Sequence, residues 1–301
     1  MHERAHADRF ARRAAARHAS DELREGVIAT TSRFRFHARA SALAALTLSI
    51  AAAGCGKTRK AAPIGDVGGE HLLVFCTTRA SGTPSEYDVA LYDADAGGFR
   101  SVVGLNSTYG QSEPCLSDDG GFICFASPRA TGSGGSDIYV YGREAEALVA
   151  TPGLNTAANE TYPRFTHDSV RMAFVRDSSG VRRIKLYEPN GDSLIALPGI
   201  DSPGGTNDAA PSPDLHGDRL AFQSDRGGAM HVYLWNRAGG VANLPDLAGD
   251  TLDAEPAMSA DGRWLAFASN RSGGAGGWDV YLYDLQTASF VRLPRFNTAG
   301  D

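Results

Sequence analysis

Five polar residues recur at one position of a repeated pattern, and four of them are acidic. Each of the first four stands three residues before a proline, and the fifth ends the chain in the same register: Gln111, Glu160, Asp208, Asp253 and Asp301. Oxygen-rich groups of this kind attract a basic peptide or a hydrated Ca²⁺ ion. Paired carboxylates such as Asp208 and Asp253 are also the groups that a glycosidase uses. A solvated loop without a ligand has the same composition, so these alternatives stay open.

Two cysteines flank a predicted hairpin turn at residues 118–121. Cys115 and Cys124 are placed symmetrically about that turn, and Cys76 lies in the preceding repeat. Direct cross-strand neighbours lie close enough to form a disulfide, and the alternative is a pair of small buried hydrophobic side chains. No Cys-x-x-Cys or His-Cys spacing indicates zinc, so we expect no metal site here.

The histidines that follow the N-terminal region are scattered over different repeats. His71, His167, His216 and His231 lie at strand starts or turns, where we expect incidental surface residues and no metal site. No Ser-His-Asp arrangement, nucleophile elbow or metalloprotease motif occurs, so no residue is assigned a catalytic role.

Arginine and aspartate recur on either side of a second hairpin. The three predicted pairs are Arg79 with Asp88, Arg129 with Asp137, and Arg271 with Asp279. Repetition favours a structural role, in which each exposed pair ties two strands together and contributes about 0.2–1 kcal/mol. We therefore expect Asp137→Ala to cost little stability.

These residues are carried by a sequence unit that occurs five times. Its central phenylalanines are spaced by 50, 49, 48 and 45 residues: Phe75, Phe125, Phe174, Phe222 and Phe267. A period of this size is typical of propellers, solenoids and arrays. In residues 113–159 the unit contains four short apolar segments bounded by turn-forming residues, which predicts four antiparallel strands. The sequence therefore predicts an all-β fold, a β-propeller of five four-stranded antiparallel blades over residues 62–301. Loops that precede the innermost strands meet at one mouth of the central channel, where the five polar residues would form a ring.

One repeat carries a family resemblance. It contains Pro256-Ala-Met-Ser-Ala-Asp-Gly262, then Leu265-Ala-Phe-Ala-Ser-Asn-Arg271, then Asp279-Val-Tyr-Leu-Tyr-Asp284. These motifs resemble the repeat of TolB-like β-propellers of the bacterial cell envelope. The resemblance covers about residues 62–301 and departs from the pattern where Arg183 and His231 replace the third-strand aspartate. It implies a propeller whose channel mouth holds partner peptides, and no contact residue of that family is transferred.

The N-terminal region resembles a secretion signal. Residues 41–53 are small or apolar, too short to span a bilayer, and follow Arg33, Arg35 and Arg39. Small residues then precede Cys55 as in a bacterial lipobox, which predicts a lipidated Cys55 at the start of the mature chain. The alternative is ordinary cleavage after a small-residue site, with Cys55 incidental. We divide the chain into an N-terminal extension and signal peptide (1–54), a linker after the lipidated cysteine (55–61) and the propeller (62–301).

Charge argues against nucleic acid as a partner. Residues 1–54 hold nine of the 29 basic and five of the 35 acidic residues, which leaves 20 basic and 30 acidic residues for the remainder. An acidic domain repels nucleic acid and anionic lipid.

We expect a monomeric, non-enzymatic module on the periplasmic side of the outer membrane, anchored by lipid alone. It would bind an envelope protein or peptide at the channel mouth. We expect no cofactor, with a weakly bound Ca²⁺ ion as the alternative. A carbohydrate-active propeller enzyme of the glycosidase or lyase type, with carboxylates at that mouth, is the alternative.

Overall fold

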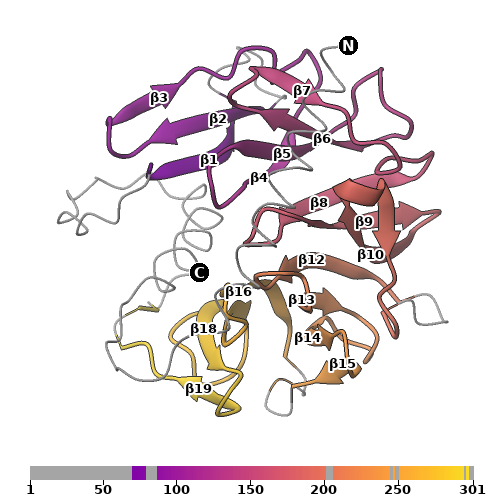
Figure 1. Ribbon diagram of the computed structural model, residues 1–301. Coiled ribbons are helices and arrows are strands. Elements are labelled where there is room, and N and C mark those ends of the chain that lie inside the picture. The colour runs from indigo at the N-terminus through magenta and orange to yellow at the C-terminus, as the bar shows by residue number, and fades with distance from the viewer. Residues whose placement is uncertain are drawn as a thin grey trace, which may run out of the picture.

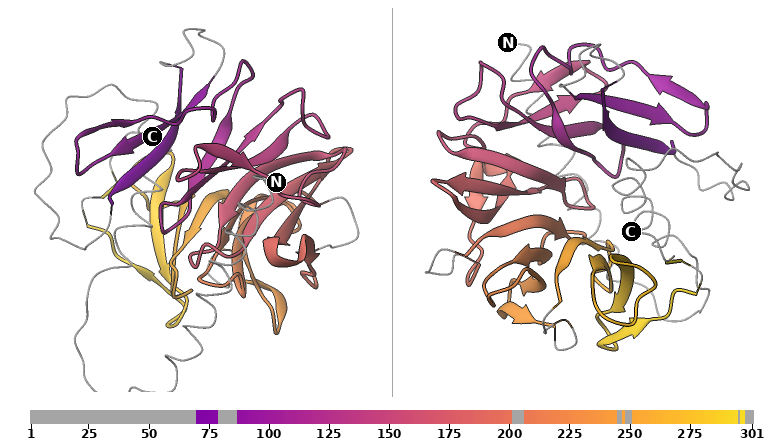
Figure 2. Two further views of the ribbon diagram at one scale, coloured as in Figure 1. Left: turned by 45° about the horizontal axis from the view of Figure 1, so that its top comes forward. Right: turned by 180° about the vertical axis from the view of Figure 1, so that it is seen from behind.

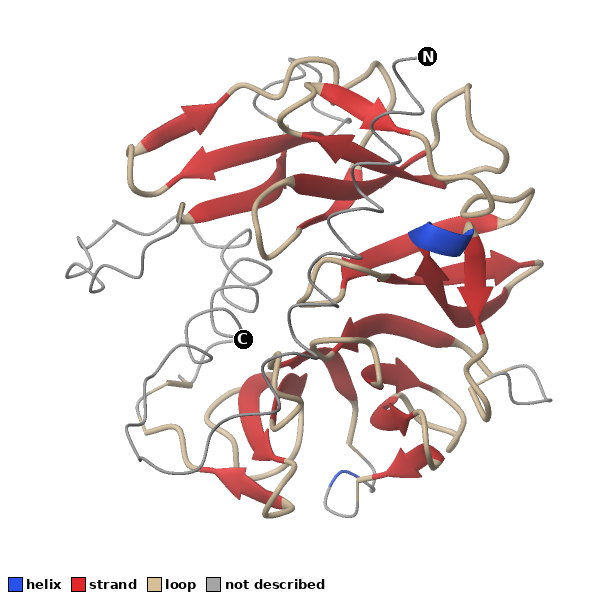
Figure 3. Cartoon of the chain, in the orientation of Figure 1, coloured by secondary structure: helices blue, strands red, loops and turns tan. Residues whose placement is uncertain are grey.

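Strands make up nearly all of the regular structure in the described part of the chain. The computed structural model describes residues 70–78, 87–200, 206–244, 247, 251–294 and 296–297. Strand after strand, coloured red in Figure 3, is separated by short turns, and the 3-10 helix η1 (Pro189–Gly191) spans a single turn. The described strands are β1 (Leu72–Thr77), β2 (Asp88–Asp93), β3 (Gly98–Arg100), β4 (Ser112–Leu116), β5 (Phe122–Ser127), β6 (Asp137–Gly142), β7 (Ala147–Val149), β8 (Asn159–Phe165), β9 (Met172–Ser178), β10 (Val181–Glu188), β11 (Ser193–Ile195), β12 (Asp208–Pro213), β13 (Arg219–Ser224), β14 (His231–Asn236), β15 (Gly240–Asn243), β16 (Asp253–Met258), β17 (Trp264–Ser269), β18 (Asp279–Asp284) and β19 (Ser289–Val291).

The strands form five antiparallel sheets in chain order, which we call blades one to five. Blade one contains β1–β3, and blades two to five contain β4–β7, β8–β11, β12–β15 and β16–β19. Figure 1 shows the blades following one another around a circle, and Figure 2 shows them from two further directions. The predicted five-bladed all-β propeller is confirmed. Blades two to five have four strands, whereas blade one has three in its described part, and the residues that precede position 70 lie outside the described part of the chain.

The hydrophobic core lies between neighbouring blades. Between blades three and four, Val175 and Ile184 pack in one cluster with Phe222 and Trp235, all at most 1% exposed. Equivalent clusters join the other consecutive pairs of blades. The sequence repeat explains why these clusters recur, because alternate side chains of each strand face the same neighbouring sheet. Burial of these side chains is the main force that orders the blades around the axis.

Antiparallel topology places the connections at two opposite ends of the propeller. The first-to-second and third-to-fourth strand turns of each blade lie at one end, which we call the turn face. The second-to-third connections and the links to the next blade lie at the other end, the loop face. No helix in the described residues has the length and apolarity needed to span a bilayer.

Candidate binding face

The predicted ring of polar residues is buried at the starts of the innermost strands. Asp208 and Asp253 are the first residues of β12 and β16, Glu160 is the second residue of β8, and Gln111 directly precedes β4. All four side chains are at most 1% exposed. Asp301 lies outside the described residues. These four residues therefore do not form the solvated, open ring that the sequence suggested.

Three of the four pair with an arginine of their own blade. The Arg176 Nε atom donates to the Glu160 Oε1 atom at 2.7 Å. Two arginines that follow the second strands of blades four and five make the corresponding contacts, Arg226 with Asp208 at 2.9 Å and Arg271 with Asp253 at 2.8 Å. We call this repeated unit the acid–arginine pair. Each carboxylate charge is met inside the blade, so the argument that the ring attracts a cation loses its main support, and ligand binding by these residues stays a prediction.

The arginines are held by aromatic rings as well as by carboxylates. The Arg226 guanidinium lies 4.9 Å from the centroid of the Phe222 ring, and the Arg271 guanidinium lies 5.2 Å from that of Phe267. Cation–π contacts of this kind add to the attraction when they are shielded from water. The phenylalanine at the centre of each repeat thus serves both the core and the acid–arginine pair.

Two of the three predicted hairpin pairs, those of Arg129 and Arg271, are wrong in their partners, and the third is not tested. Arg271 contacts Asp253, whereas Asp279 accepts hydrogen bonds from the backbone of its own glycine-rich loop, from Ala275 at 2.7 Å and Gly276 at 3.1 Å. Asp137 likewise accepts from the Gly134 amide and is fully buried. These aspartates order loops, and their burial contradicts the expectation that Asp137→Ala would cost little. Asp88 is also buried, and Arg79 lies outside the described residues.

A strained backbone position recurs two residues after each member of the ring. The residue before each first-strand proline has a left-handed φ: Glu113 (54°), Tyr162 (52°), Ala210 (46°) and Glu255 (50°). At each of these sites the strand pairing shifts register, which is a β-bulge. Left-handed φ values cost free energy in residues other than glycine, so four of them at one repeated position indicate that the fold requires the bulge.

The bulges bring side chains from different blades together. The Tyr162 backbone amide of blade three donates to the Glu113 carboxylate of blade two at 2.5 Å. Burial raises the pKa of Glu113, and the negative charge of Glu255 in blade five raises it further. The innermost strands therefore place two carboxylates near each other. Sequence reasoning overlooked these positions, although each stands directly before a proline of the repeat.

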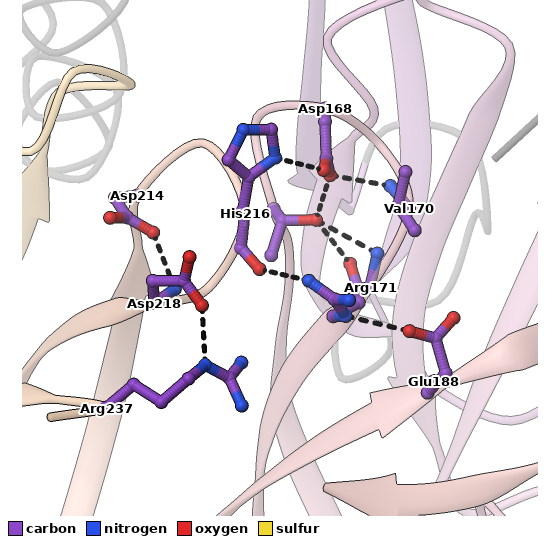
Figure 4. A network of polar contacts seen from close by, with 9 residues as sticks. Asp168, Val170, Arg171, Glu188, Asp214, His216, Asp218 and Arg237 are labelled. Carbon is purple, nitrogen blue, oxygen red and sulfur yellow. Dashed lines mark hydrogen bonds and ion pairs between the residues drawn. The ribbon is translucent and has the colours of Figure 1, made fainter. Parts of the chain in front are cut away.

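The turn face is closed by contacts between turns of different blades. The His167 ring of blade three contacts Asp118 of blade two at 2.9 Å through Nδ1 and the Met258 carbonyl of blade five at 3.2 Å through Nε2. Figure 4 shows a second part of this network, in which His216 contacts Asp168 at 2.8 Å while Arg171 donates to the His216 carbonyl at 2.7 Å. We call these contacts the turn network.

The turn network predicts a pH-dependent stability. Burial lowers the pKa of His167, but the hydrogen bond and the charge of Asp118 outweigh it and raise that pKa above its ordinary value. The folded state therefore binds the proton more tightly, and this stabilisation is complete below the unfolded pKa and is lost as pH rises through the folded value. We expect His167→Gln to lower the denaturation midpoint more at about pH 6 than at about pH 9. An equal loss at both pH values would contradict this role.

The predicted hairpin register of the cysteines is confirmed. Cys115 of β4 lies directly opposite Cys124 of β5, and both thiols are free. A hydrogen bond from Cys124 lowers the pKa of Cys115, whereas burial raises the pKa of Cys124. The disulfide stays a prediction, favoured by this register.

That disulfide can be tested on protein secreted into an oxidising compartment. We expect alkylation of the unfolded, unreduced chain to label Cys76 and to leave Cys115 and Cys124 joined in one peptide pair. In the control variant Cys124→Ser, Cys115 should become labelled. Labelling of all three propeller thiols in the parent chain would exclude the disulfide.

The histidines are structural, and one of them is not at the surface. His231 is 9% exposed and contacts the second oxygen of Asp253 at 3.1 Å, so it joins the acid–arginine pair of blade five. His71 contacts Asp95 at 2.7 Å on an exposed turn. Among the described residues, no group of three or more His, Cys, Asp and Glu side chains could hold a metal ion.

Several exposed apolar side chains lie on connections of the loop face, and others lie on the outer strands of the blades. Those on the loop face include Tyr87 (55% exposed), Tyr109 (43%), Leu252 (40%) and Trp278 (41%). Tyr87 and Trp278 occupy the same repeat position, directly before Asp88 and Asp279. Large exposed aromatic residues are enriched where proteins bind one another. The loop face therefore combines the glycine-rich loops with the apolar side chains that a partner could contact.

Solved propellers share this architecture. TolB from Acinetobacter baumannii superposes with a TM-score of 0.58 at 23% identity, over 75% of this chain and 53% of that protein. A putative TolB from Agrobacterium tumefaciens gives 0.52 at 14% identity, over 67% and 75%. The fold is that of a TolB-like propeller. The chain spans about half the length of the Acinetobacter protein.

Other proteins share the TolB-like propeller fold. An oligogalacturonate lyase in complex with manganese superposes with a TM-score of 0.51 at 10% identity, over 68% of this chain and 60% of the lyase. No model of a known protein family matches the sequence, and no curated protein matches it. At these identities the likeness establishes the fold, and the function has to be argued from the surface.

Proposed function

We propose that this chain is a protein-binding propeller of the bacterial cell envelope, which receives an envelope protein or peptide on its loop face. The observation that carries the proposal is the set of exposed apolar residues on that face, Tyr87, Tyr109, Leu252 and Trp278. They project from connections and not from the inter-blade core, so folding alone does not require them. The TolB-like fold supports the same reading.

The mouth of the channel belongs to this proposed surface. The buried ring residues lie beneath the connections of the loop face and fix them, as the Thr156 hydroxyl illustrates by donating to Glu160 at 2.7 Å. The ring would thus act as the rigid support of a peptide site, while the side chains above it make contact. Preorganised supports of this kind reduce the entropy that binding costs.

Substitution of the apolar loop residues tests the proposal. The variant Tyr87→Ser with Trp278→Ser should lose capture of envelope proteins that the parent propeller binds and cross-links. The matched control is Leu194→Ser, which removes an apolar residue of similar exposure (37%) from the outer strand β11. Equal capture by the parent and the double variant would overturn the proposal.

The lyase-type enzyme remains the competing function. The likeness to the oligogalacturonate lyase favours it, but the carboxylates offered for it, Asp208 and Asp253, are buried and paired with arginines. A carboxylate that acts as an acid or base must reach the substrate. Cleavage of an oligogalacturonate by the purified propeller, lost in Asp208→Asn, would favour the enzyme over the binding module.

We further propose that Cys55 is lipidated and holds the propeller at the periplasmic side of the outer membrane. Cys55 lies outside the described residues, and the proposal rests on the small residues and the arginines that precede it. Each buried CH₂ group of an acyl chain contributes about 0.8 kcal/mol to membrane binding. We expect Cys55→Ser to move the protein to the soluble fraction, while the control Cys76→Ser stays with the membrane. Membrane association that is unchanged in Cys55→Ser would contradict the anchor.

A further inference from the structure

Exposed carboxylates lie almost entirely at one end of the propeller. Among the described residues nine Asp and Glu side chains are exposed, and eight of them belong to the turn face: Glu70, Asp95, Asp118, Glu144, Glu146, Asp192, Asp218 and Asp261. The ninth, Glu255, lies on the innermost strand β16. The exposed arginines on the described turns of that face are Arg219 and Arg237. The turn face therefore carries a strong excess of negative charge.

The described connections of the loop face carry no exposed carboxylate. Asp177 and Asp225 are half-buried there, and the acids at the adjoining strand ends are buried: Asp88, Asp137, Glu160, Asp208, Asp253 and Asp279. Arg182, at the start of β10, is half exposed and contacts Asp177 at 3.6 Å. The negative charge that would repel anionic lipid is thus concentrated at the turn face, at the opposite end from these connections.

Amphipathic rings stand on the loop face in place of exposed acids. Tyr87, Tyr109 and Trp278 are between 41% and 55% exposed, and Leu252 adds an exposed aliphatic side chain. Tyrosine and tryptophan are enriched where membranes meet water, because each ring has an apolar body and a polar tip. An exposed apolar area on a face without exposed acids is the kind of surface that binds a protein or a membrane.

The exposed rings stand on a backbone that neighbouring blades hold in place. The amide of a ring residue donates to the carbonyl that precedes the third strand of the blade before it: Gln111 to Tyr87 (2.8 Å), Glu160 to Ser136 (2.8 Å) and Asp253 to Met230 (2.9 Å). The Leu252 amide also donates to the Asn270 side chain at 2.7 Å. The loop face therefore presents its apolar side chains from fixed positions, which lowers the entropy that contact with a surface costs.

The predicted anchor at Cys55 leaves either end of the propeller free to meet the membrane. Glu70 follows Cys55 by 15 residues, and a chain of that length spans about 50 Å when extended. The longest strand, β10, has eight residues, which corresponds to about 25 Å. The linker can reach past either face, so the surfaces of the two faces decide the orientation.

We infer that the loop face rests on the lipid surface, with Tyr87, Tyr109 and Trp278 in the interfacial layer and the acidic turn face directed away from the membrane. This inference rests on the proposed lipid anchor and goes beyond the proposed protein partner, which would meet the loop face at the bilayer surface. Anionic headgroups repel the turn face. The acyl chains on Cys55 supply the affinity, so the aromatic contacts need only select the orientation.

The three tryptophans of the chain report the orientation directly. Trp278 is exposed on the loop face, Trp264 is half-buried at the turn-face end of β17, and Trp235 is fully buried. The mature lipidated protein is placed in protein-free vesicles of zwitterionic and anionic phospholipids with brominated acyl chains, which quench tryptophan on contact. We expect quenching that persists in Trp264→Phe and is lost in Trp278→Phe. Loss in Trp264→Phe instead, or no quenching in any of the three proteins, would overturn the inference.

Added charge tests the electrostatic part of the argument. Ser133→Glu with Ser272→Glu places two carboxylates on exposed positions of the loop face and should reduce the quenching of Trp278, more so at low salt than at high salt. The matched control is Ser193→Glu with Gln286→Glu, which adds the same charge to exposed positions of the turn face and should not reduce it. Equal effects of the two pairs, or none from the loop-face pair, would refute the orientation.

The outcome is separable from that of the proposed function. If Tyr87→Ser with Trp278→Ser abolishes capture of envelope proteins in detergent while brominated lipids do not quench Trp278, the protein-binding face stands and the lipid contact falls. If Trp278 is quenched in protein-free vesicles while capture does not depend on Tyr87 and Trp278, the lipid contact stands and the protein-binding face is wrong.

Discussion

Replacing Asp253 by alanine should lower the free energy of unfolding by about 3–5 kcal/mol, because it leaves a mostly buried arginine without its anion. Asp253 is completely buried, and its two oxygens contact Arg271 at 2.8 Å and His231 at 3.1 Å. Arg271 is only 13% exposed, so water cannot replace the lost carboxylate well. Denaturant unfolding followed by tryptophan fluorescence measures the loss.

An exposed pair of the same chemistry is the control for that measurement. Asp218 contacts Arg237 at 2.6 Å, but the two side chains are 54% and 44% exposed. Asp218→Ala should change the free energy of unfolding by less than about 1 kcal/mol. Similar losses for the two variants would mean that burial of the acid–arginine pair does not matter.

Adding a single methyl group at Gly134 should destabilise the propeller by roughly 2–3 kcal/mol through steric overlap. A Cβ atom there would lie 1.9 Å from the Ala158 carbonyl oxygen and 2.9 Å from that of Thr156, and both are backbone atoms that cannot rotate away. Displacement of residues 156–158 would also loosen the contact of Thr156 with Glu160. We expect faster hydrogen exchange at the Glu160 amide, which donates to the Ser136 carbonyl.

Gly98 offers the matched control for Gly134. A Cβ atom added at Gly98 has no neighbour within 4 Å, so Gly98→Ala should leave the stability within about 0.5 kcal/mol. A loss in Gly134→Ala no larger than that of Gly98→Ala would show that the glycine-rich loop of blade two adjusts freely.

The sequence predicted the blades because their signal is periodic. Strand spacing, turn residues and the opposition of Cys115 and Cys124 follow from alternation and short hairpins, and the structure confirms them. Side chains alternate between the two faces of a strand, so the register of one residue pair in a regular hairpin determines which face every other side chain occupies.

The site was predicted less well because a bulge interrupts that regularity. The register shift at Glu113 and at Glu255 reverses which side chains share a face of the innermost strand. Counting from the proline therefore identified the right repeat position but not its surroundings, and Asp253 lies inside its blade against Arg271. The partner of that arginine could not be deduced while both Asp253 and Asp279 were at plausible distances along the chain.

Glutamine at position 111 is unremarkable in the sequence, since it is polar like its equivalents. Only the contact of Arg176 with Glu160 shows that blade two has an amide where blade three has the carboxylate of an acid–arginine pair.

The turn network has a consequence for how the molecule unfolds. Solenoid repeats contact only their neighbours, so they can melt one at a time from an end. Here His167 of blade three contacts both blade two and blade five, and the Leu215 amide of blade four donates to the Ala260 carbonyl of blade five. Loss of any one of these blades would release contacts in the others, which favours a single cooperative transition over stepwise fraying.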